Sequence, residues 1–411
     1  MATHLAAVAL AKGEPFVVQT RPTPRPGPDE LLIEVKVVAL NPADRLMRDQ
    51  GLLISTYPTV IGFDIAGLVL EVGENVPVDA TADDDDDGVA GLRRPLFRPG
   101  VTRVAAYAAS FWRSFGSDYG AFQERCLVPW QHAAPLPDEG ISWNQAATLP
   151  VAVQVPLSAW DAMGLPRVGE ATASSFSSFS SSSVSAAAAA SVGPDANEEA
   201  RDDKRHKREA LLVWGASSSV GTMGVQTARL LRGDDESAVA AVYAVCGAAN
   251  RTYVGSVLGA DRVFDYKDSR VVEAIVSAAG EDGLTIRHCF LATGQLAPCQ
   301  AVLKAFIADD QGRGGGRRKA MIASAPVVPP DAEEVEGTET IFVMPSMDEG
   351  ERMAQFRYWM GTWMRQKLAG GAIRPSPDPR VVGKGLEAIN TGLDVLARGV
   401  SCAKLVVEVV E

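Results

Sequence analysis

The sequence contains few of the residues that most often build metal sites and disulfide frameworks. Its 411 residues include only five cysteines and four histidines. No two cysteines stand in a CxxC pair or another close ligand spacing, and their number is odd. This pattern indicates free thiols in a reducing compartment and excludes a small disulfide-stapled scaffold.

Long apolar runs and an excess of positive charge are also lacking. No run approaches the roughly 18 apolar residues of a membrane-spanning helix, and the first residues lack the charged and apolar segments of a secretory signal. Acidic residues number 51 and basic residues 39, which gives a net charge of −12. That charge argues against nucleic acid or an anionic membrane as the main partner, and we expect a cytoplasmic protein.

The first part of the chain, residues 1–150, reads as strands and loops. Apolar and β-branched residues indicate strands over 31–40 and 59–73, the second of them bent by its glycines. A helix is expected to begin after Ser142, because Gln145 follows three residues later as in a capping box.

The segment 171–208 is rich in serine, then in alanine, and then in charged residues of both signs. It has too little apolar surface to form a core, so we predict a disordered surface insertion.

From residue 209 onward strand and helix patterns alternate, which predicts parallel βαβ units. The expected strands are 208–215, 237–246, 262–266, 286–293 and 319–325, and the expected helices are 220–231, 251–260 and 269–280. After residue 340 we expect one helix over 380–399 and a last strand over 403–410. The predicted fold class is therefore α/β.

The turn between the first strand and helix of this series, in LLVWGASSSVGTMGVQTARLL (211–231), favours a bound dinucleotide. Small residues there allow backbone N–H groups to approach a pyrophosphate, which the positive end of the helix dipole also attracts. A tight corner without a ligand remains the alternative. We prefer the cofactor interpretation because the turn opens a long βαβ series.

The end of the second strand indicates which dinucleotide binds. NAD enzymes usually place a carboxylate there to bind the ribose hydroxyls, but Cys246 is followed by GAANR, which has none. Arg251 can pair with a 2′-phosphate, so NADPH is favoured as the cofactor. The alternative, that Arg251 is only a surface charge at a helix start, remains open.

Seven segments occur in an order typical of one family. They are NPADRLMRDQG, YPTVIGFDIAGLVLEVGENV, YGAFQERCLVP, AATLPVAVQVPLSAW, VWGASSSVG, LGADRVFDYKD and SCAKLVVEV. Together they resemble the medium-chain dehydrogenase/reductase superfamily, and within it the zinc-free quinone oxidoreductases and the fungal trans-acting enoyl reductases. Only the segments 79–95, 171–208 and 309–318 interrupt the resemblance.

The resemblance implies two folded domains. A GroES-like partial β-barrel covers residues 1–155 and is completed by residues 339–411. A Rossmann domain, with a doubly wound parallel sheet, covers residues 156–338 and binds NADP; the insertion 171–208 lies within it.

The same resemblance bears on zinc. In zinc-binding members a cysteine and a histidine would fall at Asn41 and Phe63. Phenylalanine cannot ligate a metal and asparagine is a poor zinc ligand. The second zinc site of such members requires four closely spaced cysteines, but residues 79–126 contain only Cys126. We therefore predict no metal.

The resemblance also implies which residues bind the cofactor. They are Pro42, Ala43, Asp44 and Arg45 at the nicotinamide end, Ser217, Ser218, Ser219 and Val220 at the pyrophosphate, Gly247, Ala248, Ala249, Asn250, Arg251 and Tyr266 at the adenosine end, and Ile322, Ala323, Val400 and Ser401 elsewhere. Tyr266 could equally be a core tyrosine.

The substrate-lining residues implied by the resemblance form one continuous segment. They are Thr148, Leu149, Pro150, Val151, Ala152, Val153, Gln154 and Val155. Asn41 is a weak catalytic candidate, with a plain turn residue before Pro42 as the alternative. Asp64 is expected to fix the first domain through a buried pair. No proton donor stands out, and solvent is the expected proton source.

These observations predict a zinc-independent reductase that transfers a hydride from NADPH to an activated C=C bond. The preferred substrate class is an enoyl thioester. One alternative is an NADPH:quinone or enone oxidoreductase, and another is a non-catalytic NADPH-binding scaffold. The likeness of the motifs to those of fungal trans-acting enoyl reductases, together with the Ser/Ala-rich insertion, suggests a protein of a filamentous fungus that acts in secondary metabolism. A carrier-bound substrate on a polyketide synthase partner would then be reduced by a monomer or homodimer.

Overall fold

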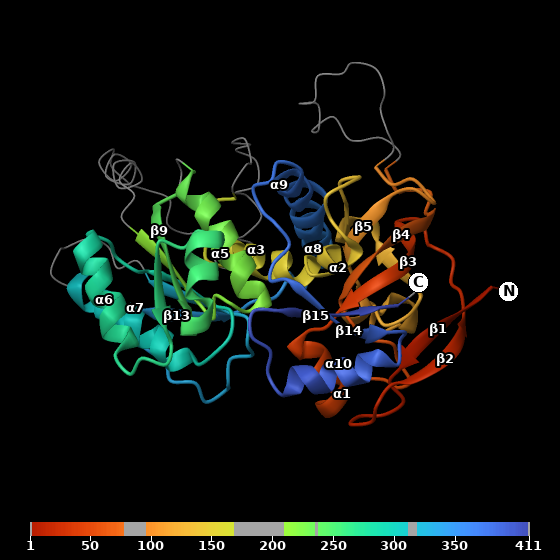
Figure 1. Cartoon of the computed structure of the whole chain (residues 1–411), viewed down its shortest axis with the longest axis horizontal. Coiled ribbons are helices and arrows are strands. Elements are labelled where there is room, and N and C mark those ends of the chain that lie inside the picture. Colours follow the sequence, from red (N-terminus) through yellow and green to blue (C-terminus); the bar gives the residue numbers. More distant parts are fainter. Residues whose placement is uncertain (1, 78–95, 168–208, 235–236, 311–318, 410–411) are drawn as a thin grey trace, which may run out of the picture. The chain divides into compact units, whose positions relative to one another are not determined.

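Figure 1 shows a computed structural model of the chain, which describes residues 2–77, 96–167, 209–234, 237–310 and 319–409. The predicted insertion 171–208, and almost all of those at 79–95 and 309–318, lie outside the described residues. The chain divides into two compact units. The first comprises Met1–Leu157, Ser217–Met223 and Met344–Glu411, and the second comprises Ser158–Ala216 and Gly224–Val343. The domain boundaries implied by the resemblance stay a prediction.

The first unit is built on a seven-stranded sheet in the order β14-β15-β3-β4-β5-β7, with β6 paired to β3. The strands are β3 (Glu30–Ala39), β4 (Asp64–Val72), β5 (Arg103–Tyr107), β6 (Arg125–Pro129), β7 (Ala133–Pro135), β14 (Pro379–Lys384) and β15 (Lys404–Glu408). A separate two-stranded sheet joins β1 (Thr3–Val8) to β2 (Val17–Pro22). The predicted strand over 31–40 is confirmed, and that over 59–73 begins later, at Asp64.

The expectation of strands and loops alone before residue 142 is wrong, because a helix follows β3 directly. This helix, α1 (Pro42–Gln50), begins after Asn41 and ends at Gly51, whose φ is 66°. Proline is well suited to the first turn of a helix, and a left-handed glycine commonly ends one. The capping box of Ser142 and Gln145 is confirmed at the start of α2 (Trp143–Ala147).

The expectation for the C-terminal part is only partly right. The helix predicted over 380–399 is in fact β14, paired in parallel with β15, followed by α10 (Ala388–Ala397) after the positive-φ Gly385. A pairing partner distant in sequence decides between strand and helix here, which local pattern cannot foresee. Further helices were not predicted: α8 (Glu349–Phe356), the π-helical η7 (Arg357–Met364) and α9 (Arg365–Ala369).

The second unit contains a six-stranded parallel sheet in the order β10-β9-β8-β11-β12-β13. Its strands are β8 (Glu209–Trp214), β9 (Val239–Cys246), β10 (Arg262–Asp265), β11 (His288–Leu291), β12 (Ala320–Ser324) and β13 (Thr338–Phe342). The first five confirm the predicted strands, and β13 was not foreseen. The predicted alternation of strand and helix is confirmed by α5 (Ser219–Arg232), η6 (Tyr253–Val257) and α6 (Val271–Asp282), whereas α7 (Leu296–Asp310) was not predicted.

Helices cover both faces of this sheet, as the alternation of side chains along β8 requires. Leu212 and Trp214 belong to a buried cluster that also contains residues of α6 and α7. A Cβ placed at Gly224 of α5 would lie 2.9 Å from Phe290 and 3.5 Å from Val213, so α5 packs closely on the other face. The doubly wound α/β arrangement is therefore confirmed.

One further α-helix and four short helical turns complete the described residues. They are α3 (Pro150–Ala162), η2 (Ser110–Arg113), η3 (Ser117–Tyr119), η4 (Trp130–His132) and η5 (Ala248–Asn250). None of the helices in the described ranges is long and apolar enough to cross a membrane.

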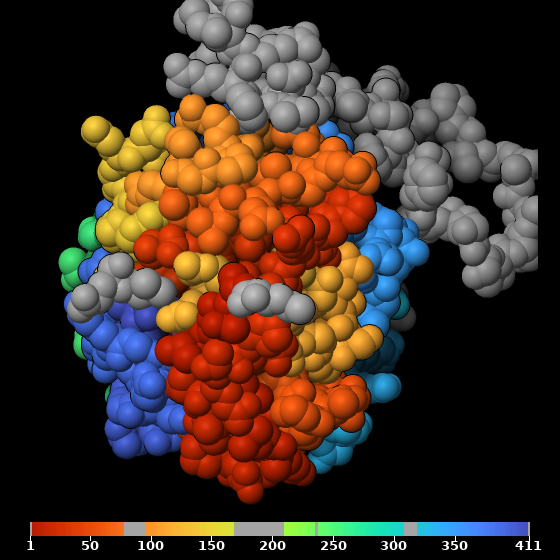
Figure 2. Space-filling model, turned by 90° about the vertical axis from the view of Figure 1, so that its right-hand side faces the viewer, coloured from red at the N-terminus to blue at the C-terminus, as the bar shows by residue number. Residues whose placement is uncertain are grey.

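The first unit brings the two ends of the chain together. Figure 2 shows N-terminal residues in red beside C-terminal residues in blue on one face. Asn390 of α10 accepts a hydrogen bond from the N–H of Phe16 at 3.0 Å and donates one to its carbonyl at 2.9 Å.

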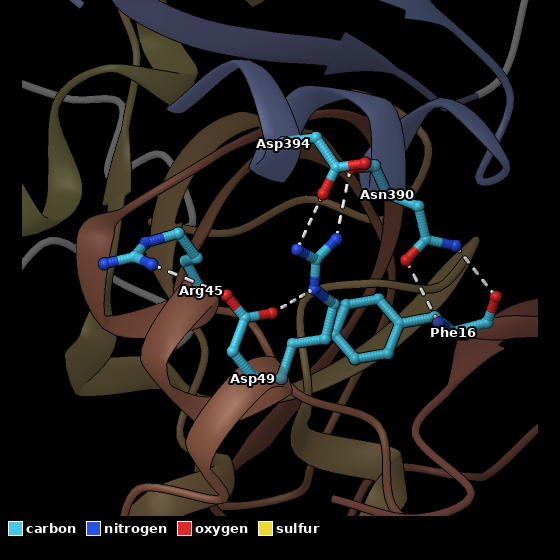
Figure 3. Close-up of polar contacts among 6 residues, drawn as sticks. Phe16, Arg45, Asp49, Asn390 and Asp394 are labelled. Atoms are coloured by element: carbon cyan, nitrogen blue, oxygen red, sulfur yellow. Dashed lines mark hydrogen bonds and ion pairs between the residues drawn. The ribbon is translucent and has the colours of Figure 1, made fainter. Parts of the chain in front are cut away.

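Arg48 of α1 extends this contact between the two ends; Figure 3 shows two of its partners, Asp49 and Asp394, near Phe16 and Asn390. Its guanidinium donates to Asp49 and Asp394 at 2.7 Å each, and to the carbonyl of Asn390 at 3.2 Å. Its side chain is only 10% exposed. The helix that begins at Asn41 is thus held against α10 by charge-assisted hydrogen bonds.

We expect Arg48→Met to lower the free energy of unfolding by about 1–3 kcal/mol, because it leaves polar groups of α10 without a partner. Arg45→Met is the matched control on the same helix, since Arg45 makes only a 3.5 Å ion pair and is 32% exposed. Denaturant unfolding followed by circular dichroism measures both. Equal losses for the two variants would contradict the role given to Arg48.

Candidate functional site

The strand–turn–helix at residues 214–219 has the features of a dinucleotide-binding turn. Gly215 has a φ of 78°, and a Cβ there would lie 2.6 Å from the carbonyl oxygen of Thr293, so only glycine fits. Helix α5 begins four residues later, at Ser219. The Ser219 hydroxyl is buried and has no hydrogen-bond partner among the described residues. An unpartnered donor at a helix N-terminus suits a phosphate oxygen.

Other predicted residues of this turn have internal partners. The Ser218 hydroxyl accepts from the N–H of Gly221 at 3.1 Å, and its carbonyl accepts from Thr222 at 2.8 Å. Ser217, Ser219 and Val220 are partly exposed. The turn therefore offers a helix start and small side chains.

The structure brings together two of the residues predicted at the adenosine end. A Cβ placed at Gly247, just after β9, would lie 3.5 Å from the ring of Tyr266, just after β10. Tyr266 is 54% exposed, so the alternative of a core tyrosine is wrong.

The hollow at this end carries charges of both signs, because Arg251 and Arg262 line it together with Asp261, Asp265 and Asp268. Ala248, Ala249 and Arg251 are exposed, Asn250 is partly exposed, and Arg251 lines an open hollow of about 750 Å³ beside β10. An exposed guanidinium on this side of the sheet can meet a phosphate without losing an internal partner.

Four predicted cofactor residues lie at positions that give no direct indication of a cofactor contact. Ile322 and Ala323 are fully buried in β12, so their side chains belong to the core and any contact there would come from the main chain. Val400 is partly buried and Ser401 exposed, in the connection between α10 and β15.

A buried polar cluster in the first unit surrounds Asn41. The Nζ of Lys404 lies 2.9 Å from Asp64 Oδ2 and donates to Asn41 Oδ1 at 2.5 Å. Asn41 Nδ2 donates to the same Asp64 oxygen at 2.9 Å. The other oxygen, Asp64 Oδ1, accepts from the backbone N–H of Val151 at 2.7 Å. The expected buried pair of Asp64 is therefore confirmed, with Lys404 as its partner.

The cluster joins four segments that are distant in the sequence. Asn41 precedes α1, Asp64 begins β4, Val151 lies in the first turn of α3, and Lys404 begins β15. Asp64 is fully buried, and the side chains of Asn41 and Lys404 are nearly so. Asn41 is thus a helix N-cap whose side-chain oxygen and nitrogen each make a hydrogen bond within the cluster, more than the plain turn residue of the alternative.

Lys404 is the residue that the sequence interpretation missed. A signal was present, because a lysine stands at the head of the apolar run KLVVEVV, where a strand was expected. A lysine is seldom fully buried without a paired acid, so a lysine in a buried strand predicts a nearby carboxylate such as that of Asp64.

Asp44 lies one helical turn beyond Asn41 and is fully buried. One carboxylate oxygen accepts from the N–H of Asn41 at 2.7 Å, and the other has no partner among the described residues. Burial, opposed by that hydrogen bond and assisted by the nearby charge of Asp64, raises the pKa of Asp44 to about 7. Of the other predicted residues beside Asp44, Pro42 is exposed and Ala43 and Arg45 are partly exposed.

The predicted substrate segment is mostly buried. Only Val151 and Val155 are partly exposed; Thr148, Leu149, Pro150, Ala152, Val153 and Gln154 are buried. The two exposed valines stand four residues apart on α3, so they lie on one face of the helix.

A buried aromatic group lies elsewhere in the first unit. The His132 ring stacks on Phe356 with a centroid distance of 3.8 Å, and Tyr107 lies 5.0 Å from Phe356. Burial lowers the pKa of His132 to about 3 and raises the pKa of the Tyr107 hydroxyl. Tyr107, which is 7% exposed, therefore holds its proton tightly and does not act as a proton donor.

The residues around Asn41 do not fit a zinc ion. Phe63, half-buried, packs its ring 5.6 Å from that of Tyr107, and the Asn41 amide is already bonded to Asp64 and Lys404. Across the described ranges no group of three or more His, Cys, Asp or Glu side chains could hold a metal ion.

Comparisons with known proteins agree with this arrangement. The alcohol dehydrogenase GroES-like domain family matches residues 27–138. Trans-enoyl reductase tndF of Aspergillus flavipes is 35% identical over 410 residues, which cover 98% of each chain. This chain belongs to the medium-chain dehydrogenase/reductase superfamily.

Further relatives support the same assignment. Trans-enoyl reductase tazE of Aspergillus terreus is 36% identical over 351 residues, covering 85% of this chain and 94% of its own. The crystal structure of an alcohol dehydrogenase superfamily protein from Novosphingobium aromaticivorans superimposes with a TM-score of 0.65 at 17% identity, over 99% of this chain and 100% of its own. The chain is thus an oxidoreductase that uses a nicotinamide dinucleotide, which sets aside the non-catalytic scaffold.

We expect the buried Asp44 to make stability fall as pH rises. Its pKa is about 7 in the folded state against a usual 3.8, so the folded state binds the extra proton between these values. The free energy of unfolding should therefore decrease from pH 4 to pH 7, by up to roughly 4 kcal/mol for this group alone.

The test is the variant Asp44→Asn, which keeps an acceptor for Asn41 but cannot titrate. Its free energy of unfolding should fall less steeply between pH 5 and pH 7 than that of the wild type. Glu74→Gln, at an exposed position, is the control and should leave the slope unchanged. A D44N profile parallel to the wild type would show that Asp44 is ionised throughout.

Proposed function

We propose that this chain is an NADPH-dependent, zinc-independent reductase that saturates the C=C bond of an enoyl thioester. The observation that carries the proposal is the 35% identity to a trans-enoyl reductase over 98% of both chains. The substrate is an acyl chain bound to a carrier, presented in trans by a polyketide synthase. The predicted cofactor and substrate residues are part of this proposal.

The reaction requires little more than orientation and charge stabilisation. When bound, the dihydronicotinamide supplies a hydride. The β-carbon of the thioester gains the hydride, the electron pair of the C=C bond moves toward the carbonyl oxygen, and the resulting enolate takes a proton from solvent at its α-carbon. The acceptor is already electrophilic, so hydrogen-bond donors near the carbonyl oxygen can replace a Lewis acid.

The proposal of zinc independence rests on residue types. Phe63 has no donor atom, and the Asn41 side chain is bonded on both its oxygen and its nitrogen. Metal analysis of the purified protein should find less than about 0.1 zinc per chain, since no such ligand set exists at this position. Stoichiometric zinc that is lost together with activity on chelation would contradict this part of the proposal.

The preference for NADPH rests on the segment after β9, which has no carboxylate and ends in the exposed Arg251. We expect Arg251→Ala to raise the NADPH dissociation constant about tenfold or more, because a charge-assisted phosphate contact is lost, and to leave NADH almost unchanged. Fluorescence titration measures both constants. Arg270→Ala, an exposed arginine of the same unit, is the control. Equal weakening for both coenzymes would remove Arg251 from the site.

Turnover with a panel of acceptors tests the reaction class. The absorbance of NADPH should fall with crotonyl and longer enoyl thioesters, and more slowly with quinones and simple enones. Rates that are highest with quinones would favour the quinone oxidoreductase alternative. A flat signal with all thioesters, although NADPH binds, would reject the enoyl reductase.

A further inference from the structure

The buried cluster of Asn41, Asp64 and Lys404 restricts what Asn41 can do. Lysine carries only hydrogen-bond donors, so the atom of Asn41 that faces its Nζ at 2.5 Å must be the amide oxygen. The nitrogen then faces Asp64 Oδ2, 2.9 Å away, and gives it one of its two hydrogens. The two ion-pair partners therefore exclude the flipped amide, and the oxygen of Asn41 is occupied.

One donor hydrogen of Asn41 remains beyond these contacts. The amide carries two N–H hydrogens, and a single carboxylate oxygen uses one of them. Hydrogen bonding to Asp64 on one side and Lys404 on the other also polarises the amide. Asn41 can consequently offer a reactant an N–H group.

We propose that Asn41 donates this N–H to a carbonyl oxygen of a bound reactant, and that Lys404 and Asp64 are positioning residues that orient it. The inference rests on the proposed function, in which negative charge develops on a carbonyl oxygen as hydride arrives. The chemistry recognised is a carbonyl oxygen, either that of the thioester or that of the nicotinamide amide.

The placement of Asn41 favours such a role. It is the N-cap residue of α1, so its side chain stands at the positive end of that helix, where negative charge is stabilised. The backbone around it is fixed as well, because Asp44 accepts from its N–H at 2.7 Å and Arg48 ties α1 to α10. A donor held in this way loses little entropy when it meets a developing charge.

The decisive variants change the donor without removing side-chain volume. Asn41→Asp is isosteric and can still accept from Lys404, but its second oxygen faces Asp64, so any proton that it holds is shared with that carboxylate and none is left for a reactant. We expect it to lower kcat about 100-fold, the usual effect of removing one donor to a developing oxyanion. Asn390→Asp is the matched control, because this amide bridges α10 and Phe16; it should lower Tm but keep kcat within about twofold.

Lys404 is tested through Asn41 in a double-mutant cycle. Lys404→Met frees the amide to flip and should lower kcat roughly tenfold or more, whereas Lys404→Arg should retain more activity. Adding Lys404→Met to Asn41→Ala should lower Tm further, because Asp64 loses its ion-pair partner, but should cause no further loss of kcat in the folded protein, since Lys404 affects the reactant only through Asn41. Circular dichroism confirms folding of each variant, and additive losses would overturn the positioning role.

Whether the carbonyl oxygen belongs to the thioester or to the nicotinamide is decided by comparing kcat with the NADPH dissociation constant of the variants. A thioester oxygen predicts a lower kcat with an unchanged NADPH dissociation constant, and a nicotinamide oxygen predicts weaker NADPH binding. Folded Asn41→Asp protein that keeps both within about twofold overturns the inference. The variants are assayed with whichever acceptor the wild type reduces, so a preference for quinones would revise the proposed function and leave this test intact.

Discussion

The ion pair between Asp64 and Lys404 is the interaction on which the first unit depends. Both charges are withdrawn from water, which is unfavourable unless the pair is close and its remaining hydrogen-bonding groups are engaged. The structure meets both conditions, with a 2.9 Å separation and further contacts from Asn41 and the N–H of Val151. Each member begins or borders a different element, so a single cluster sets the relative positions of α1, β4, α3 and β15.

The same cluster shows how a fold shared with zinc-dependent enzymes can hold a different polar centre. At the two positions where a cysteine and a histidine would be expected, this chain has Asn41 and Phe63. Asn41 forms hydrogen bonds with the ion pair of Asp64 and Lys404, and Phe63 packs against the ring of Tyr107. The ammonium group of Lys404 lies between Asp64 and the amide oxygen of Asn41.

How much could be predicted from the sequence depended on whether the determining contacts are local. The βαβ series could be predicted because the spacing of apolar residues along each strand and helix follows the side chains that are buried against one sheet. The start of α1 was not, because proline after Asn41 reads equally as a turn. β14 was mistaken for helix since its parallel neighbour β15 lies some twenty residues further on. The buried role of Asp64 was foreseen, but its partner Lys404 lies 340 positions away and could not be identified from spacing.

Contacts between the chain's beginning and its end have a consequence for biosynthesis. Strand β15 pairs with β3, and α10 is bonded to Phe16 and Arg48. During translation β3 must therefore remain incompletely paired until β15 leaves the ribosome. The second unit is complete well before then, so its parallel sheet is free to form first while the earlier-made segments still lack their partners.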